Sequence, residues 1–261
     1  MVVDAFTYNN ERELLEIRLN ILDDSVDQFV IMEATKTFSG KPKPLYFERD
    51  KGLFKKWEHK IKYYVLDDWD NKEIWQTARN SPNTDYGKGA QHWLQEFYIK
   101  EHLKVPLAHL KDDDLCFIGD VDEIWDSRFT YETPGTWTFK LGLKVYTYYL
   151  NQRSDEVFYG TMVGRYGDIK DKCFNHLRTN PDFRLDDCGW HFTSLKGGLR
   201  RKLDDSYTEE SYNTPWVQTH LEENIEKNKD FLGRGFKYWI DESEWPKFLK
   251  VNREKYKHLL K

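Results

Sequence analysis

The sequence has few cysteines and no long hydrophobic run. Its three cysteines, Cys116, Cys173 and Cys188, lie far apart and form no Cys-x-x-Cys pair, which argues against a disulfide framework or a zinc site. No stretch approaches the roughly 18 apolar residues that a membrane-spanning helix needs, and the N-terminus has no signal-peptide pattern. We therefore expect a soluble cytoplasmic protein without a transmembrane segment, which at most contacts a membrane surface peripherally.

The chain also lacks blocks of charge of one sign. Its 40 basic and 45 acidic residues are mixed along the sequence and give a net charge of -5, so we expect no nucleic-acid partner. The patterns GxxxxGK[ST], GxGxxG, HExxH and GxSxG do not occur either. These absences argue against P-loop, dinucleotide-binding, zinc-protease and serine-hydrolase chemistry.

Aromatic residues, in contrast, are abundant. The 261 residues include 10 Trp, 16 Tyr and 16 Phe, and 39% of the chain is hydrophobic, which is enough for a sizeable core. Aromatic faces that a core does not need are available to stack on sugars and bases. The composition therefore favours, weakly, a carbohydrate or nucleotide ligand.

Strand and helix patterns alternate in the first half of the chain. Apolar runs near residues 2–6, 29–33, 61–66 and 115–119 predict strands, and the segments between them predict helices. From Thr136 to Leu195, short aromatic and β-branched segments predict added antiparallel strands. Residues from about Thr219 onward are helical in pattern. We expect an α/β fold with a mostly parallel central sheet, antiparallel additions and a helical C-terminal tail.

An acidic stretch, Asp120-Val121-Asp122-Glu123, follows the fourth predicted strand. Strand alternation turns Asp120 and Asp122 to one side and Glu123 to the other, at the edge where open α/β sheets bind ligands. Two convergent carboxylates suit Mn²⁺ or Mg²⁺, which take their remaining ligands from water and substrate phosphates. We therefore expect a metal-held diphosphate. The alternative is that these residues only cap a following helix.

A second polar stretch, Asp186-Asp187-Cys188-Gly189-Trp190-His191, opens another predicted strand. An imidazole at this place can complete the metal shell or contact the diphosphate. We therefore include His191 among the candidate metal ligands. The alternative is a histidine that only packs beside the aromatic residues.

A basic segment follows, running from Lys196 to Lys202 as Lys-Gly-Gly-Leu-Arg-Arg-Lys. The glycines free the backbone, and we expect a loop in which Arg200 and Arg201 close over phosphates through bidentate contacts. The alternative is a solvated surface, which is the usual role of a run of charges.

Polar and aromatic residues also lie at or just beyond the ends of the first two predicted strands. Phe6, Asn9, Glu11 and Glu33 can read a base edge and ribose hydroxyls there, and the loop from Thr35 to Pro44 is expected to line the same crevice. The alternative for Phe6 and Asn9 is core packing and capping.

Taken together, these stretches resemble glycosyltransferase family 17. The resemblance runs in order over most of the chain, and its most specific parts are Thr37-Phe38-Ser39-Gly40-Lys41-Pro42-Lys43-Pro44, Gly119-Asp120-Val121-Asp122-Glu123-Ile124 and Gly189-Trp190-His191. It implies a GT-A fold, a nucleotide-sugar donor such as UDP-N-acetylglucosamine, a divalent metal at the acidic stretch, and inversion at the anomeric carbon.

The resulting hypothesis is metal-dependent transfer of a sugar from the nucleotide donor to a glycan or glycolipid hydroxyl. We expect one domain over 1–261, with a nucleotide-binding half at 1–125, an acceptor half at 126–218 and a helical tail at 219–261. Asp187 is the candidate catalytic base, with Asp186 and Glu210 as substitutes, since a base cannot be a carboxylate already neutralised by the metal. The alternatives are a non-catalytic carbohydrate- or nucleotide-binding module and a sugar nucleotidyltransferase.

Overall fold

The structure is a computed structural model that describes residues 1–81, 90–128, 137–207 and 212–261. The strands are β1 (Val2–Thr7), β2 (Gln28–Ala34), β3 (Ile61–Leu66), β4 (Leu115–Asp120), β5 (Glu123–Trp125), β6 (Phe139–Thr147), β7 (Gln152–Arg165), β8 (Phe183–Leu185), β9 (Gly189–Thr193) and β10 (Tyr238–Ile240). The helices are α1 (Arg12–Leu22), α2 (Tyr46–Asp50), η1 (Lys51–Trp57), α3 (Lys72–Arg79), α4 (Ala90–His102), α5 (Lys104–Leu107), α6 (Tyr166–Ile169), α7 (Phe174–Thr179), α8 (Leu199–Ser206), α9 (Pro215–Glu226), α10 (Lys247–Val251) and η4 (Arg253–Leu259).

The described strands form one mixed sheet in the order β3-β2-β1-β4-β7-β6-β9-β5, with β8 paired to β6 and β10 paired to β7. Strands β3, β2, β1 and β4 are parallel to one another, as the sequence predicts. Ala5, in the middle of β1, pairs with Val30 on one side and Ile118 on the other. The carboxyl ends of these strands therefore meet at one edge, where the site lies.

The second half adds strands to this sheet. Strand β7 is antiparallel to β4 and to β6, which confirms the predicted antiparallel additions. Two pairings differ from that prediction, because β6 is parallel to both β8 and β9. The tail expected to be helical also contains a strand, β10, because Tyr238–Ile240 pairs with β7. This segment forms a strand because it pairs with β7, which is distant in sequence, and a local pattern cannot reveal such a pairing.

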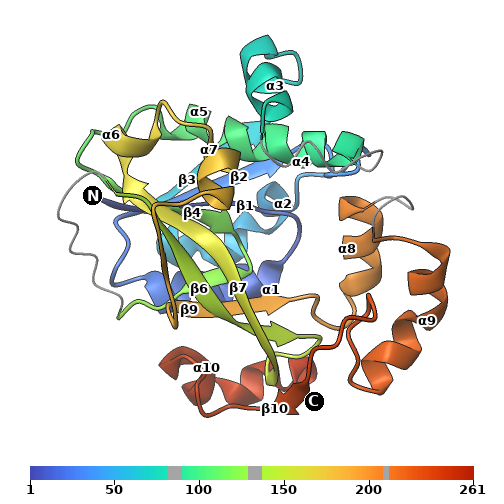
Figure 1. Cartoon of the computed structure of the whole chain (residues 1–261). Helices are drawn as coiled ribbons and strands as arrows, with labels where there is room; N and C mark the ends of the chain where they lie inside the picture. Colours follow the sequence, from blue (N-terminus) through green and yellow to red (C-terminus); the bar gives the residue numbers. More distant parts are fainter. Residues whose placement is uncertain (82–89, 129–136, 208–211) are drawn as a thin grey trace.

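Alternation along the strands divides the core between the two faces of the sheet. Val3 and Ala5 face one side and pack with residues of α4 and α5, whereas Phe6 and Phe117 face the other and pack with Leu15 of α1. Figure 1 shows α3, α4 and α5 above the sheet, α1 and α10 below it, and α8 and α9 beyond one end. No helix among the described residues is long and apolar enough to cross a membrane.

Candidate functional site

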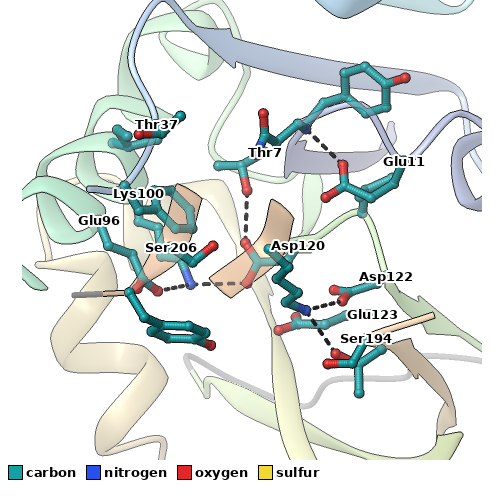
Figure 2. A pocket seen from close by; sticks show the side chains of 18 of the residues that line it. Thr7, Glu11, Thr37, Glu96, Lys100, Asp120, Asp122, Glu123, Ser194 and Ser206 are labelled. Atoms are coloured by element: carbon teal, nitrogen blue, oxygen red, sulfur yellow. Dashed lines mark hydrogen bonds and ion pairs between the residues drawn. The ribbon is translucent and has the colours of Figure 1, made fainter. Parts of the chain in front are cut away.

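A cavity of about 390 Å³ lies at the carboxyl ends of β1, β2 and β4. Residues from both halves of the chain line it, including Thr7, Asp120 and Asp122 from the first half and His191 and Lys202 from the second. Figure 2 shows the carboxylates of Glu11, Asp120 and Asp122 pointing into this space. The loop after β2 contributes Lys36, Thr37, Phe38 and Lys43, which confirms that it lines the crevice.

The acidic turn, residues 120–123, forms the middle of the cavity wall. Strand β4 ends at Asp120, the chain turns, and β5 begins at Glu123. No helix follows the turn, so the helix-cap alternative is wrong. The predicted opposite orientation of Glu123 is also wrong, because this side chain lines the same cavity. Alternation holds only while a strand continues, and here the strand is interrupted.

Glycines make room for the buried Glu123 side chain. A Cβ at Gly119 would lie 2.5 Å from Glu123 Oε2, and one at Gly160 would lie 2.6 Å from its Cδ. The carboxylate that sits there accepts a hydrogen bond from Arg178 at 3.1 Å. A larger residue at either glycine would displace it into the cavity.

Asp120 is held by one hydroxyl and two cations. The Thr7 hydroxyl donates to it at 2.8 Å, Lys100 Nζ lies 3.0 Å away and Arg178 Nη2 lies 3.5 Å away. Burial acts to raise the pKa of Asp120, but Lys100 and Arg178 outweigh it and hold the pKa well below its usual range. Asp120 is therefore a fixed negative charge that orients two cations beside the cavity.

Asp122 is held by Lys202 and His191. Lys202 Nζ lies 3.1 Å and His191 Nε2 lies 3.4 Å from the same carboxylate oxygen, Oδ2. Burial acts to raise the pKa of Asp122, but Lys202 and His191 outweigh it and lower the pKa far below its usual range. The structure thus brings together two residues that lie 69 positions apart and that the sequence proposes as metal ligands.

The donor set at Asp122 fits a divalent cation. A carboxylate oxygen and an imidazole nitrogen converge there, and the other ring nitrogen of His191 is buried without a hydrogen-bond partner among the described residues. Within the described ranges, however, no three or more His, Cys, Asp and Glu side chains are grouped so that they could hold a metal ion. A divalent cation bound here would take two ligands from the described residues and the rest from phosphate oxygens and water.

Two of the residues proposed for nucleotide binding line the cavity. Asn9 and Glu11 both lie there, and the Asn9 backbone N–H donates to Glu11 Oε2 at 2.8 Å. Burial, followed by the charge of Asp122, raises the pKa of Glu11. Asn9 also donates through its amide to Asp205 of α8 at 3.3 Å, which ties the loop after β1 to that helix.

Phe6 and Glu33 lie outside the cavity lining. Phe6 is fully buried among the residues packed on α1, and the Arg18 guanidinium lies 4.4 Å from its ring centroid. Glu33 is also fully buried, where it accepts hydrogen bonds from Lys43 Nζ at 2.9 Å and from the Tyr46 backbone at 2.6 Å. Glu33 thereby anchors the loop after β2, whose other side lines the cavity.

The basic segment, residues 196–202, is only partly the expected loop. The loop ends at Gly198, and both arginines lie in a helix. Helix α8 begins at Leu199, so Arg201 and Lys202 project toward the cavity while Arg200 points away to Glu222, 3.2 Å distant. Arg201 and Lys202 also line an adjacent cavity of about 390 Å³, which extends to the Gly197-Gly198 turn. The two cavities therefore meet at Lys202.

The proposed catalytic bases lie elsewhere. Asp187 is 79% exposed, pairs with Lys144 at 3.4 Å and does not line either cavity. Asp186 accepts a hydrogen bond from the Tyr159 hydroxyl, also outside both cavities. Glu210 lies outside the described residues. None of these side chains is brought to the acidic turn by the described part of the structure.

The cavity residues that the sequence did not single out include three charged ones, Lys100, Arg178 and Glu156. A partial signal existed for Lys100, because Glu96 lies four residues earlier on a predicted helix and forms the expected ion pair at 2.7 Å. Nothing local directs Lys100 or Arg178 toward Asp120, since α4 and α7 reach the cavity through tertiary packing.

The fold and the cavity define an α/β protein with a cavity at the carboxyl edge of the parallel part of its sheet, the place where open α/β sheets bind ligands. A model of glycosyltransferase family 17 matches residues 1–196, and the chain belongs to this family. The matched part contains the acidic turn and His191.

Curated relatives carry a more specific name. Over 129 residues the chain is 31% identical to the human and rat proteins named beta-1,4-mannosyl-glycoprotein 4-beta-N-acetylglucosaminyltransferase, and 30% identical to the mouse protein of that name. The match covers 47% of this chain and 21% of each relative, so it spans about a fifth of their length. No solved structure matches the chain.

Proposed function

We propose that the chain transfers N-acetylglucosamine from UDP-N-acetylglucosamine to a hydroxyl of a glycan acceptor, with inversion at the anomeric carbon. Membership of glycosyltransferase family 17 and the names of the curated relatives support the reaction class and the sugar. The parallel strands with added antiparallel strands are compatible with a GT-A-type scaffold, which we include in the proposal.

The observation that carries the proposal is the charge pattern around the acidic turn. Lys100, Arg178 and Lys202 lie within 3.5 Å of Asp120 or Asp122 along one wall of the cavity. Fixed cations and dipoles at such a place stabilise the charge that develops on a departing nucleoside diphosphate. Asp120 and Asp122 orient these cations, so the site is arranged before the donor binds.

Asp122 and His191 are the residues that would hold Mn²⁺ or Mg²⁺, according to the fit described above. When bound there, the ion would neutralise negative charge on the diphosphate. We do not assign Asp120 to the metal ion, because Thr7, Lys100 and Arg178 already surround its carboxylate. We assign it to the orientation of the two cations.

The nucleoside would lie on the side of the cavity formed by the loops after β1 and β2. Asn9 and Thr37 offer polar groups there, and Phe38 and Trp93 offer aromatic faces. A base stacked on such a face and held by a few polar groups is the usual arrangement in a small-molecule pocket. Asn9 and Glu11, two of the four residues that the sequence predicts to contact the base and ribose, lie on this side.

The test is to measure nucleoside diphosphate release from a panel of nucleotide sugars, with and without glycan acceptors, in Mn²⁺ and in EDTA. We expect release with UDP-N-acetylglucosamine that rises when a suitable acceptor is added, and thermal stabilisation by UDP with Mn²⁺. Binding without release in every condition would favour a non-catalytic module. Pyrophosphate release from a nucleoside triphosphate would favour a nucleotidyltransferase.

A further inference from the structure

An inverting transfer needs a base on the acceptor side of the cavity. The base removes the proton of the acceptor hydroxyl from the side opposite the departing diphosphate, so it has to be a carboxylate or imidazole that no cation already neutralises. The carboxylates among the described residues that line the cavity are Glu11, Glu96, Asp120, Asp122, Glu123 and Glu156.

Cations hold most of these carboxylates at short distance. The closest nitrogen–oxygen distances are 2.7 Å for Lys100–Glu96, 3.0 Å for Lys100–Asp120, 3.1 Å for Lys202–Asp122 and 3.1 Å for Arg178–Glu123. For Glu156 the nearest described cation is Arg234, 3.7 Å away, and its guanidinium donates to Asp230 instead, at 2.7 Å. Glu11 forms no ion pair with the described residues. Two carboxylates therefore remain, Glu11 and Glu156.

The fold separates these two along the cavity. Glu11 follows β1 and accepts a hydrogen bond from the Asn9 backbone, on the side proposed for the nucleoside. Glu156 lies on β7, among the strands added in the second half of the chain. Because the nucleoside is proposed to fill the side formed by the loops after β1 and β2, only Glu156 lies on the side that remains open for the acceptor.

Strand geometry places Glu156 relative to the acidic turn. Because β7 is antiparallel to β4 and Ile118 pairs with Met162, lower numbers on β7 lie farther past the carboxyl end of β4. The Phe158 and His191 rings contact each other in a tilted arrangement with 4.3 Å between their centroids, and His191 contacts Asp122. Glu156 shares its strand face with Phe158 and lies about 7 Å farther along the strand. It thus lies just beyond Asp122 and His191, the pair proposed to hold the metal ion.

The surroundings of Glu156 suit an acceptor sugar. Phe158, Phe231 and Leu232 line the same part of the cavity, and an aromatic face beside a carboxylate is a common arrangement for binding a sugar ring. The Glu156 side chain is 23% exposed, so it is accessible from the cavity. Burial raises the pKa of Glu156 although Arg234 lowers it, and a raised pKa makes a carboxylate a stronger base.

We propose that Glu156 is the catalytic base of the transfer, an assignment that rests on the function proposed above. The acceptor oxygen forms a bond to the anomeric carbon while its proton passes to the Glu156 carboxylate. The bond between the anomeric carbon and the β-phosphate oxygen breaks at the same time, and its electron pair leaves with the nucleoside diphosphate.

The experiment compares Glu156→Gln with Asp155→Asn, its neighbour on the same strand, which faces out of the cavity and whose Oδ1 accepts a hydrogen bond from the Lys237 backbone. Each variant removes one carboxylate charge and keeps the side-chain shape. With UDP-N-acetylglucosamine and acceptor, we expect Glu156→Gln to lower kcat at least 100-fold with the donor KM changed by less than about threefold. Asp155→Asn is expected to keep kcat within about twofold of the unmodified protein.

Thermal stabilisation by UDP with Mn²⁺ shows whether a variant is folded and binds the nucleotide, so it separates loss of folding from loss of chemistry. Glu156→Asp keeps a carboxylate but moves it, and this variant is expected to keep part of the activity. The proposal is overturned if Glu156→Gln turns over at the normal rate, if it loses UDP-induced stabilisation, or if Glu11→Gln alone abolishes kcat with donor binding retained. Failure of the proposed function itself would look different, because the unmodified protein would then neither bind the donor nor release the diphosphate.

Discussion

Arg18 and Asp4 form a fully buried, two-point ion pair directly behind the acidic turn. Arg18 Nε and Nη2 each donate to the Asp4 carboxylate at 2.7 Å. The remaining nitrogen, Nη1, donates to the carbonyls of Asp120 at 2.9 Å and Glu123 at 2.7 Å. One side chain of α1 therefore fixes the backbone that presents Asp120 and Asp122 to the cavity.

Replacement of Arg18 by Met is expected to destabilise the fold by about 3–5 kcal/mol, because the Asp4 carboxylate is left buried without its partner. Urea unfolding followed by circular dichroism measures this change. The double variant Asp4→Leu/Arg18→Met is expected to recover part of the loss, since no unpaired charge remains. Equal losses in the single and double variants would show that the carbonyl contacts, and not the ion pair, dominate.

Replacement of Lys202 by Gln is expected to tighten Mn²⁺ binding about tenfold or more, because the ammonium group lies 3.1 Å from the carboxylate oxygen that the metal needs. Isothermal titration with Mn²⁺ and UDP measures the affinity. Arg200→Gln is the matched control, since Arg200 lies on the same helix but pairs with Glu222 outside the cavity. Unchanged Mn²⁺ affinity in Lys202→Gln would place the metal elsewhere.

Replacement of Gly189 by Ala is expected to cost about 2 kcal/mol or more. Its φ is 150°, and a Cβ there would lie 2.3 Å from the Ile124 carbonyl oxygen in β5, the strand that follows the acidic turn. Gly40→Ala is the comparison, because Gly40 has φ 83° but open space around it, so only backbone strain of about 1 kcal/mol is expected. Thermal unfolding of both variants distinguishes steric conflict from strain.

His102 is expected to make the fold less stable in acid. The side chain is 1% exposed, and burial lowers its pKa, against the opposite effect of Asp68 and Asp67. The unfolded chain then binds a proton more readily than the folded one, so stability is complete above the unfolded pKa of about 6.5 and falls as the pH drops toward the lower folded value.

The measurement is the free energy of unfolding between pH 5 and pH 8. His102→Gln removes the titrating group while keeping a group able to bond to Tyr64, whose hydroxyl lies 3.1 Å from His102 Nε2. The variant is expected to show a smaller decline in this range. If its profile parallels that of the unmodified protein, another group causes the decline.

Local pattern was sufficient for much of the scaffold and for part of the site. Apolar runs located β1 to β4, and the interruption of an apolar run by Asp120 and Asp122 located the cavity wall. The same pattern could not decide which way Phe6 faces, because adjacent strand residues point to opposite sides and only the packing of α1 settles the choice.

Other site features depend on contacts that are distant in sequence. The sequence predicts that Glu33 contacts the nucleotide, but its carboxylate instead accepts hydrogen bonds from Lys43 and from the backbone of α2. Asp187 precedes β9 as expected, yet its side chain is directed to Lys144 and solvent. Glu156 reaches the cavity because β7 pairs antiparallel with β4, a pairing of residues more than forty positions apart that local pattern cannot show.

The Arg18 contacts also have a consequence for the order of folding. Arg18 reaches the acidic turn across 102 to 105 residues of chain, and β1 separates β2 from β4 in the sheet. Contacts of such large separation form late, since a long loop has to close before they are made. The N-terminal βαβ unit can assemble during synthesis, but the acidic turn acquires its final shape only after residues 115–125 join it. Ligand affinity is therefore expected to appear as one of the last events of folding.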